Sequence, residues 1–134
     1  MMQSDSSKGF SHGIIVRNDD IDELNHVNNV VYIRWVQEVA EAHWRSVATD
    51  ALRQQFLWVV LRHEIDYHHP IELGDAVTGS TWVGEHYGAR FERFVRLHNP
   101  VTQQVYADAK TIWCLLDAIK KRPLRIPAEV LGLL

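Results

Sequence analysis

The sequence predicts an α+β domain in which an antiparallel β-sheet wraps around one long central α-helix. A helical pattern covers Val30 to Ala48, and four segments rich in β-branched and aromatic residues follow it. The gaps between these segments are too short for a crossover helix, so neighbouring strands are expected to pair antiparallel. The chain has 134 residues, close to the usual size of one domain. We therefore expect a single domain over residues 13–134, after a flexible, serine-rich tail over residues 1–12.

The central helix is predicted from the distribution of its side chains around the helix axis. At 100° per residue, one narrow sector is polar and comprises Arg34, Gln37, Glu38, Glu41 and Arg45. Apolar side chains fill most of the remaining circumference: Val31, Ile33, Trp35, Val36, Val39, Ala40, Trp44 and Val47. Such a wide apolar arc indicates a helix that other structure covers on most sides. Asn28 and Asn29 stand where residues cap a helix N-terminus.

Five strands and a short terminal helix are expected around this helix. The strand candidates are Ile14–Arg17, Leu57–His68, Ala76–Tyr87, Ala89–His98 and Gln104–Leu116. Gly88 and the Asn99-Pro100 turn separate the last three. The final strand alternates as a half-buried strand does, with Ala107, Ala109 and Thr111 on one face. Pro127 is expected to open a helix over Ala128–Leu131.

Composition excludes several classes of protein. The net charge of −3 argues against nucleic-acid binding through bulk charge. The longest apolar run, Phe56 to Leu61, is far too short to span a membrane, and residues 1–13 lack the apolar stretch of a secretory signal. A single cysteine, Cys114, excludes an internal disulfide framework and a thiolate zinc cluster. These observations favour a cytoplasmic protein that binds neither nucleic acid nor membrane.

The common motifs of nucleotide and hydrolase chemistry are missing from the sequence. It contains no GxGxxG, no P-loop and no GxSxG. His63 and His68 resemble a zinc-binding pair, but their spacing is one residue too long for HExxH, and on a strand they point to opposite faces. Cys114 is expected to be a small buried hydrophobic residue. No metal site is therefore predicted.

The polar segment from Asp19 to Asn29 is the densest cluster of reactive side chains. Acidic residues before a helix can simply cap it and complement its dipole. Here, however, they lie several residues before the helix and are followed by His26 and Asn28. A carboxylate close to the free N–H groups of a helix start can supply a base or nucleophile together with an oxyanion hole. This combination suits acyl transfer to water.

The same segment resembles the signature of hotdog-fold acyl-CoA thioesterases, Asp-x-Asp-x-x-Gly-His-x-Asn-Asn, which matches Asp20 to Asn29. Two further landmarks match in order: residues 63–75 (HEIDYHHPIELGD) and residues 122–127 (RPLRIP). Together they resemble the 4-hydroxybenzoyl-CoA thioesterase-like branch over nearly the whole chain. Asn25 stands where many relatives have Gly, and Leu24 where plant acyl-carrier-protein thioesterases have Asn.

The resemblance implies roles for individual residues. Asp22 matches the catalytic aspartate, which activates water or attacks the thioester directly, and the backbone N–H of Asn29 matches the group that polarises the thioester carbonyl. His26 is assigned either to catalysis or to a structural hydrogen bond. The substrate-binding candidates are Asn25, Asn28 and Tyr32 in this region, and Arg90, Lys121 and Arg122 as contacts for coenzyme A phosphates, although a solvated surface is the simpler interpretation of the three basic residues.

The function implied is hydrolysis of an acyl-CoA, or acyl-carrier-protein, thioester to a free acid and thiol. No cofactor is expected, because a thiolate leaves readily and the reaction needs only a base or nucleophile and an oxyanion donor. The resemblance further implies a homodimer or homotetramer with each site between two subunits. Two alternatives remain: a non-catalytic acyl-CoA or acyl-carrier binding protein, and a hotdog dehydratase or hydratase. The identity of the acyl group does not follow from the sequence.

Overall fold

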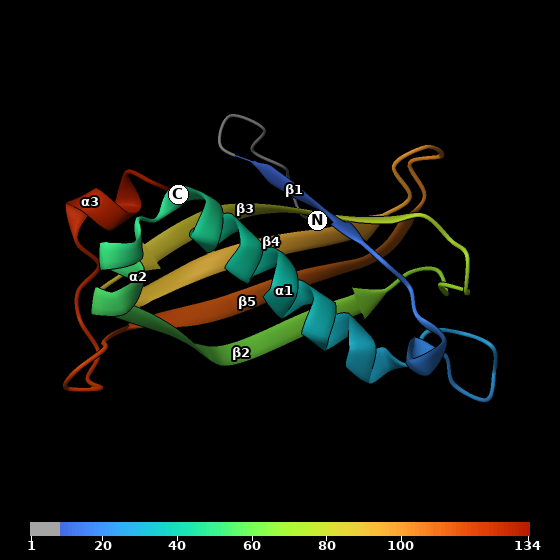
Figure 1. Cartoon of the computed structure of the whole chain (residues 1–134), viewed down its shortest axis with the longest axis horizontal. Coiled ribbons are helices and arrows are strands. Elements are labelled where there is room, and N and C mark those ends of the chain that lie inside the picture. Colours follow the sequence, from blue (N-terminus) through green and yellow to red (C-terminus); the bar gives the residue numbers. More distant parts are fainter. Residues whose placement is uncertain (1–8) are drawn as a thin grey trace.

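The structure is a computed structural model, which describes residues 9–134 and confirms a sheet that curves around one long helix (Figure 1). Its strands are β1 (Phe10–Ile14), β2 (Phe56–Tyr67), β3 (Val77–Tyr87), β4 (Arg90–His98) and β5 (Val105–Asp117). Its helices are η1 (Asn18–Asp20), α1 (Asn29–Val47), α2 (Asp50–Gln55) and α3 (Ala128–Leu131). All five strands form one antiparallel sheet in the order β1-β3-β4-β5-β2, so β2 is an edge strand.

Helix α1 lies across the concave face of the sheet, as its amphipathic pattern predicts (Figure 1). Asn28 is the N-cap, and its side chain accepts a hydrogen bond from the backbone N–H of Val30. The face toward the sheet buries Val31, Tyr32, Trp35, Val36, Val39, Ala40 and His43. The apolar arc is narrower than predicted, because Ile33 is exposed on the outer side of the helix. Gly79 of β3 lets the helix approach closely, since a side chain there would collide with Val39.

The N-terminal strand lies earlier than predicted. The strand expected at Ile14–Arg17 ends at Ile14, and Phe10 to His12, expected in the flexible tail, pair with Thr81 to Gly79 of β3. Polar residues in a strand are stable here because pairing with β3 satisfies their backbone groups whatever their side chains. The rest of the predicted tail, residues 1–8, lies outside the described residues.

Two short helical elements were not predicted. Helix α2 buries none of its residues, so it has no apolar periodicity to detect. It is held by its cap, because the Thr49 hydroxyl accepts a hydrogen bond from the backbone N–H of Leu52. The turn η1 is held by a carboxylate, described below. The terminal helix after Pro127 is confirmed.

The core consists of two clusters, one under each half of α1. The first packs Tyr32, Trp35 and Val39 against Val95 and Leu97 of β4. The second lies toward α2 and α3 and contains Phe56, Phe91, Leu115, Ile126, Val130 and Leu134. Cys114 is buried, as expected. Within residues 9–134, no helix is long and apolar enough to cross a membrane.

Candidate active site

Two carboxylates of the Asp20–Asn29 segment have different environments. Asp20 is 2% exposed, and its carboxylate accepts hydrogen bonds from the backbone N–H of Arg17 (2.9 Å) and from Nη2 of Arg34 on α1 (2.7 Å). Burial alone would raise the pKa of Asp20, but these two hydrogen bonds lower it below its ordinary value. Asp20 therefore acts as a structural anion that fastens η1 to the side of α1.

Asp22 lies in the closed loop that follows. Its backbone N–H donates to the carbonyl of His26 (2.8 Å), and its backbone carbonyl accepts from Asn25 (3.0 Å). Oδ1 accepts from the backbone N–H of Leu24 at 2.9 Å and from that of His26 at 3.4 Å. The other carboxylate oxygen, Oδ2, has no hydrogen-bond partner within the described range. One oxygen thus fixes the orientation of the carboxylate while the other is free to act on a ligand.

Asn25 makes this loop possible. Its φ is 64°, in the left-handed region that glycine adopts most readily and that Asn tolerates better than most residues. This conformation explains in physical terms why glycine suits the position. The side chain of Asn25 is exposed and does not line the cleft described below, so its observed role is to form the turn.

The start of α1 supplies a free hydrogen-bond donor. The backbone N–H of Val30 is capped by Asn28, and that of Val31 donates to the carbonyl of Asn28. The N–H of Asn29, the first residue of the helix, has no acceptor in the part of the chain that the structure describes. Unpaired N–H groups at a helix start attract negative charge.

A cleft of about 370 Å³ joins these groups. The predicted residues that line it are Asp22, His26, Asn28, Asn29 and Tyr32. The imidazole of His26 also has no hydrogen-bond partner among residues 9–134. The side chain of Tyr32 is buried, and burial raises its pKa above the ordinary value, so the phenol stays neutral.

The far wall of the cleft consists of residues that the site prediction missed. It is formed by the end of β2 and the loop after it: Tyr67, His68, His69 and Pro70. The hydroxyl of Tyr67 lies 3.4 Å from the carbonyl of Asn29, and its ring packs edge-on against Tyr32 at 5.0 Å. The signal was present, because these four residues lie in the second family landmark of the sequence.

The basic candidates lie elsewhere in the chain. Arg90 begins β4, and Lys121 and Arg122 lie in the turn after β5, at the end of the sheet that carries α2 and α3 (Figure 1). Asp22 lies at the opposite end, beside η1. One chain therefore does not bring these three residues together with the cleft.

His63 of β2 and His68, just after the end of β2, face opposite ways, as expected. His63 contacts Gln37 of α1 (3.3 Å) and Thr111 (2.9 Å), whereas His68 lies 3.2 Å from the carboxylate of Asp108. No group of three or more His, Cys, Asp or Glu side chains within residues 9–134 is arranged to hold a metal ion.

The cleft has the parts needed for acyl transfer to water. It combines a carboxylate with one free oxygen, a free backbone N–H at a helix start and an unpaired imidazole. A model of the thioesterase-like superfamily matches residues 16–134, nearly the whole chain. The protein belongs to the thioesterase-like superfamily. Its expected class, a thioester hydrolase of the hotdog fold, is thereby confirmed.

Solved structures show the same fold at low sequence identity. A protein from Pseudomonas aeruginosa has a TM-score of 0.85 and 19% identity, covering 93% of this chain and 88% of its own. A Thermus thermophilus thioesterase in complex with coenzyme A and Zn has a TM-score of 0.79 and 24% identity, covering 91% and 88%. A Synechocystis 1,4-dihydroxy-2-naphthoyl-CoA thioesterase has a TM-score of 0.75 and 17% identity, covering 89% and 90%.

A curated relative is similar over one part of its length. The chloroplastic palmitoyl-acyl carrier protein thioesterase of Gossypium hirsutum is 24% identical over 132 residues, which cover 92% of this chain and 32% of that protein. The chain therefore spans about a third of the length of the curated relative it matches.

Proposed function

We propose that this thioester hydrolase cleaves acyl-CoA to a free acid and CoA in the cleft between Asp22 and the start of α1. The observation that carries the proposal is that this one cleft contains both the carboxylate of Asp22 and the N-terminus of α1, where the N–H of Asn29 is free. The Thermus thermophilus relative, which binds coenzyme A, supports CoA as the carrier. An acyl-carrier protein is the alternative carrier, in view of the similarity to the Gossypium hirsutum palmitoyl-acyl carrier protein thioesterase.

The mechanism begins with polarisation of the thioester carbonyl by the N–H of Asn29. Asp22 then either removes a proton from water, so that hydroxide adds to the carbonyl carbon, or adds to that carbon itself. The N–H of Asn29 stabilises the resulting oxyanion, and the C–S bond breaks as the CoA thiolate leaves. In the second route an Asp22–acyl anhydride forms, and water hydrolyses it to regenerate the carboxylate. A single turnover in ¹⁸O-labelled water detects the second route where water adds to the Asp22 carbonyl carbon of the anhydride, because label then enters Asp22 and the released acid carries an unlabelled oxygen from Asp22.

The central experiment replaces Asp22 by Asn. Loss of the base or nucleophile is expected to lower kcat/KM by about 10²–10⁴ in a thiol-release assay, while the dissociation constant of acyl-CoA changes little. Asp19→Asn is the matched control, since it removes an exposed carboxylate from the same segment and is expected to retain wild-type turnover. Unchanged turnover by Asp22→Asn would overturn the proposed role of Asp22.

The same assay on the wild type tests the other functions. A non-catalytic acyl-CoA binding protein would bind acyl-CoA without turnover even as the wild type. A dehydratase or hydratase would add or remove water across the acyl chain and leave the thioester intact. Screening the wild type against short, long, branched and aromatic acyl-CoAs would identify the acyl group.

We also propose that the protein works as a dimer or a larger homo-oligomer assembled through β2. This edge strand exposes Val59 (38%) and Leu61 (49%), and Val30 at the start of α1 is 71% exposed. A long edge strand with exposed apolar side chains favours pairing with another strand. A dimer is expected for the wild type in light-scattering chromatography, and Val59→Lys together with Leu61→Lys is expected to give monomers. A monomeric wild type would contradict this assembly.

A further inference from the structure

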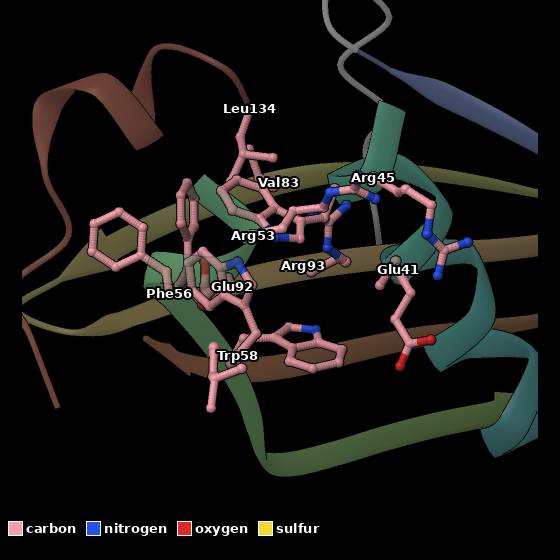
Figure 2. A pocket seen from close by; sticks show the side chains of 14 residues that line it. Glu41, Arg45, Arg53, Phe56, Trp58, Val83, Glu92, Arg93 and Leu134 are labelled. Carbon is pink, nitrogen blue, oxygen red and sulfur yellow. The ribbon is translucent and has the colours of Figure 1, made fainter. Parts of the chain in front are cut away.

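A second cavity lies between the C-terminal half of α1 and the sheet (Figure 2). We call it the Arg93 cavity; its volume is about 220 Å³, and Arg93 of β4 forms part of its wall. Its other walls come from α1, α2, β2, β3, β5 and the C-terminal residue Leu134. None of the residues assigned to thioester cleavage lines it.

Arg93 is a buried cation without a counter-charge within residues 9–134. Its side chain points toward α1, and the residue is 6% exposed. Nη1 lies 3.0 Å from Nδ1 of His43 and donates to the hydroxyl of Thr81 (3.0 Å), which itself donates to the carbonyl of Phe94. Neither Nε nor Nη2 has a hydrogen-bond partner among the described residues, and no ion pair there involves Arg93.

Both neighbours of Nη1 are neutral. Burial, reinforced by the charge of Arg93, lowers the pKa of His43 to about 4, so the imidazole accepts a hydrogen bond without carrying a charge. Burial lowers the pKa of Arg93 to about 10, which leaves the guanidinium protonated at neutral pH. A buried charge is costly unless a charge of opposite sign compensates it, and none of these contacts supplies one.

Two more donors without partners line the same cavity. The indole Nε1 of Trp113 and the Nε of Arg53 are both buried and make no hydrogen bond with any residue that the structure describes. Each is a donor that cannot accept, so its partner has to be an acceptor, and residues 9–134 supply none. Buried polar atoms normally have partners, so two orphaned donors in one cavity point to a missing acceptor.

The carboxylates near the cavity are occupied or turned away. Glu41 is exposed, and its carboxylate points away from Arg93 in Figure 2. Glu92 accepts from the backbone N–H of Glu85 (3.0 Å) and pairs with Lys110 (3.0 Å). The cavity therefore carries net positive charge among its buried groups.

Five aromatic side chains line the cavity. Trp58 packs edge-on against Trp44 at 5.8 Å and lies tilted against Phe91 at 6.3 Å, and Phe56 is also part of the wall. A dry cavity of about 150 Å³ is enough to hold benzene. The Arg93 cavity is therefore large enough for a single ring that carries one small polar group.

The cavity is separate from the cleft at Asp22. His43, which faces Arg93, is 14 residues along α1 from Asn29, and at 1.5 Å per residue this corresponds to about 21 Å. A small ligand in one of these sites cannot touch the other in the same chain.

We propose that the Arg93 cavity is a second ligand site, which binds a small aromatic or similarly compact apolar carboxylic acid as its anion. The carboxylate pairs with the free edge of the Arg93 guanidinium and accepts from Trp113 or Arg53, while the apolar body packs against the tryptophan and phenylalanine rings. The cavity thus offers a cation to the carboxylate of such a ligand and aromatic surface to its apolar body. This site is independent of the proposed thioester cleavage.

The first test compares charged and neutral ligands on the wild-type protein. Benzoate, benzamide and benzyltrimethylammonium are titrated by calorimetry and by quenching of tryptophan fluorescence, since three tryptophans line the cavity. Benzoate is expected to bind at least about tenfold more tightly than benzamide, because charge-assisted hydrogen bonds are the stronger ones. Equal affinity for the two, preference for the cation or absence of saturable benzoate binding would overturn the proposal.

The second test uses matched variants. Arg93→Gln is expected to weaken benzoate at least about tenfold and to leave benzamide within about twofold. Arg45→Gln removes an exposed arginine from the rim of the same cavity and is expected to change benzoate binding less than about twofold. Asp22→Asn is expected to bind benzoate as the wild type does; a clear change in affinity, above all the tighter binding expected when a like charge is removed, would place benzoate in the catalytic cleft and contradict a second site. The ligand comparison on the wild type decides the question even where Arg93→Gln does not fold.

Discussion

The cavities at the two ends of α1 hold polar groups of opposite kinds. At the N-terminal end, the carboxylate of Asp22 and the N–H of Asn29 face an open cleft and are positioned by a loop and a helix cap. At the C-terminal end, Arg93 lies inside the core, among aromatic rings. One end can place groups around a reacting bond in contact with water, whereas the other can select a ligand by charge. Under the two proposals, one helix separates the site of chemistry from the site of ligand recognition.

Among the predictions for the cleft at the N-terminal end, the largest effect on thioester cleavage is expected from loss of the backbone N–H of Asn29. Asn29→Pro removes that N–H but suits the first turn of a helix, and Asn28 already has the extended conformation preferred before proline. We expect kcat for thioester cleavage to fall by about 10²–10³. Asn29→Ala keeps the N–H and is expected to stay near wild-type kcat. Equal turnover in both variants would exclude the N–H of Asn29 as the oxyanion donor, and benzoate binding at the Arg93 cavity is expected to be the same in both.

Replacement of Asp20 tests whether its buried carboxylate stabilises the segment that forms the cleft. Asp20→Ala removes the acceptor for Arg17 and Arg34, and we expect the free energy of unfolding to fall by about 2–4 kcal/mol in urea titrations. Because its folded-state pKa is lowered, the stabilisation by Asp20 is present above the unfolded-state value of 3.8 and is lost as the pH falls through the folded-state pKa. Asp19→Ala, at an exposed neighbour, should leave the free energy of unfolding unchanged within experimental error.

At the C-terminal end of α1, the buried imidazole of His43 beside Arg93 predicts that the free energy of unfolding depends on pH. The folded-state pKa of His43 is about 4, against 6.5 for the free side chain, so the unfolded state binds the proton first as pH falls. Stability should therefore be full above pH 6.5 and decline by roughly 2–3 kcal/mol down to pH 4, below which this group adds no further change.

A His43→Gln variant isolates that contribution. Glutamine keeps an acceptor for Arg93 but does not titrate, so chemical denaturation between pH 4 and 6.5 should lose most of its pH dependence. A slope identical to that of the wild type would show that another group is responsible.

The smallest expected effect concerns the turn that positions Asp22. Asn25→Ala places a residue that disfavours the left-handed region at φ 64°, and we expect a loss of about 1 kcal/mol in the free energy of unfolding. Asn25→Gly, which adopts this conformation freely, should match or exceed wild-type stability in the same titration. A loss of stability in the glycine variant as large as that in the alanine variant would assign Asn25 a side-chain role instead.

The sequence predicted the elements that show a repeating pattern. Helix α1, the long strands and the buried Cys114 follow from apolar periodicity. Helix α2 was not predicted, and strand β1 was predicted too late in the chain. They are held by a cap and by pairing with β3, neither of which requires apolar side chains. Local patterns thus report which residues are buried, not which backbone groups are paired.

The cleft was predictable in part, because Asp22, His26 and Asn29 lie within one short segment. Tyr67 and His68 join it only through the folding of β2 beside α1, across a separation that no local pattern reports. In the sequence Arg93 is only a basic residue that follows the Gly88 turn, since its burial arises from three elements packed together. The second cavity follows from tertiary packing alone.

The measurement that tests the central claim most directly follows a bound acyl-CoA by native mass spectrometry. Asp22→Asn is mixed with an acyl-CoA that the wild type cleaves, and the bound species is observed over many wild-type turnover times. The proposed function predicts that the variant retains intact acyl-CoA while the wild type releases CoA and free acid. Release of both products by the variant at the wild-type rate would contradict it.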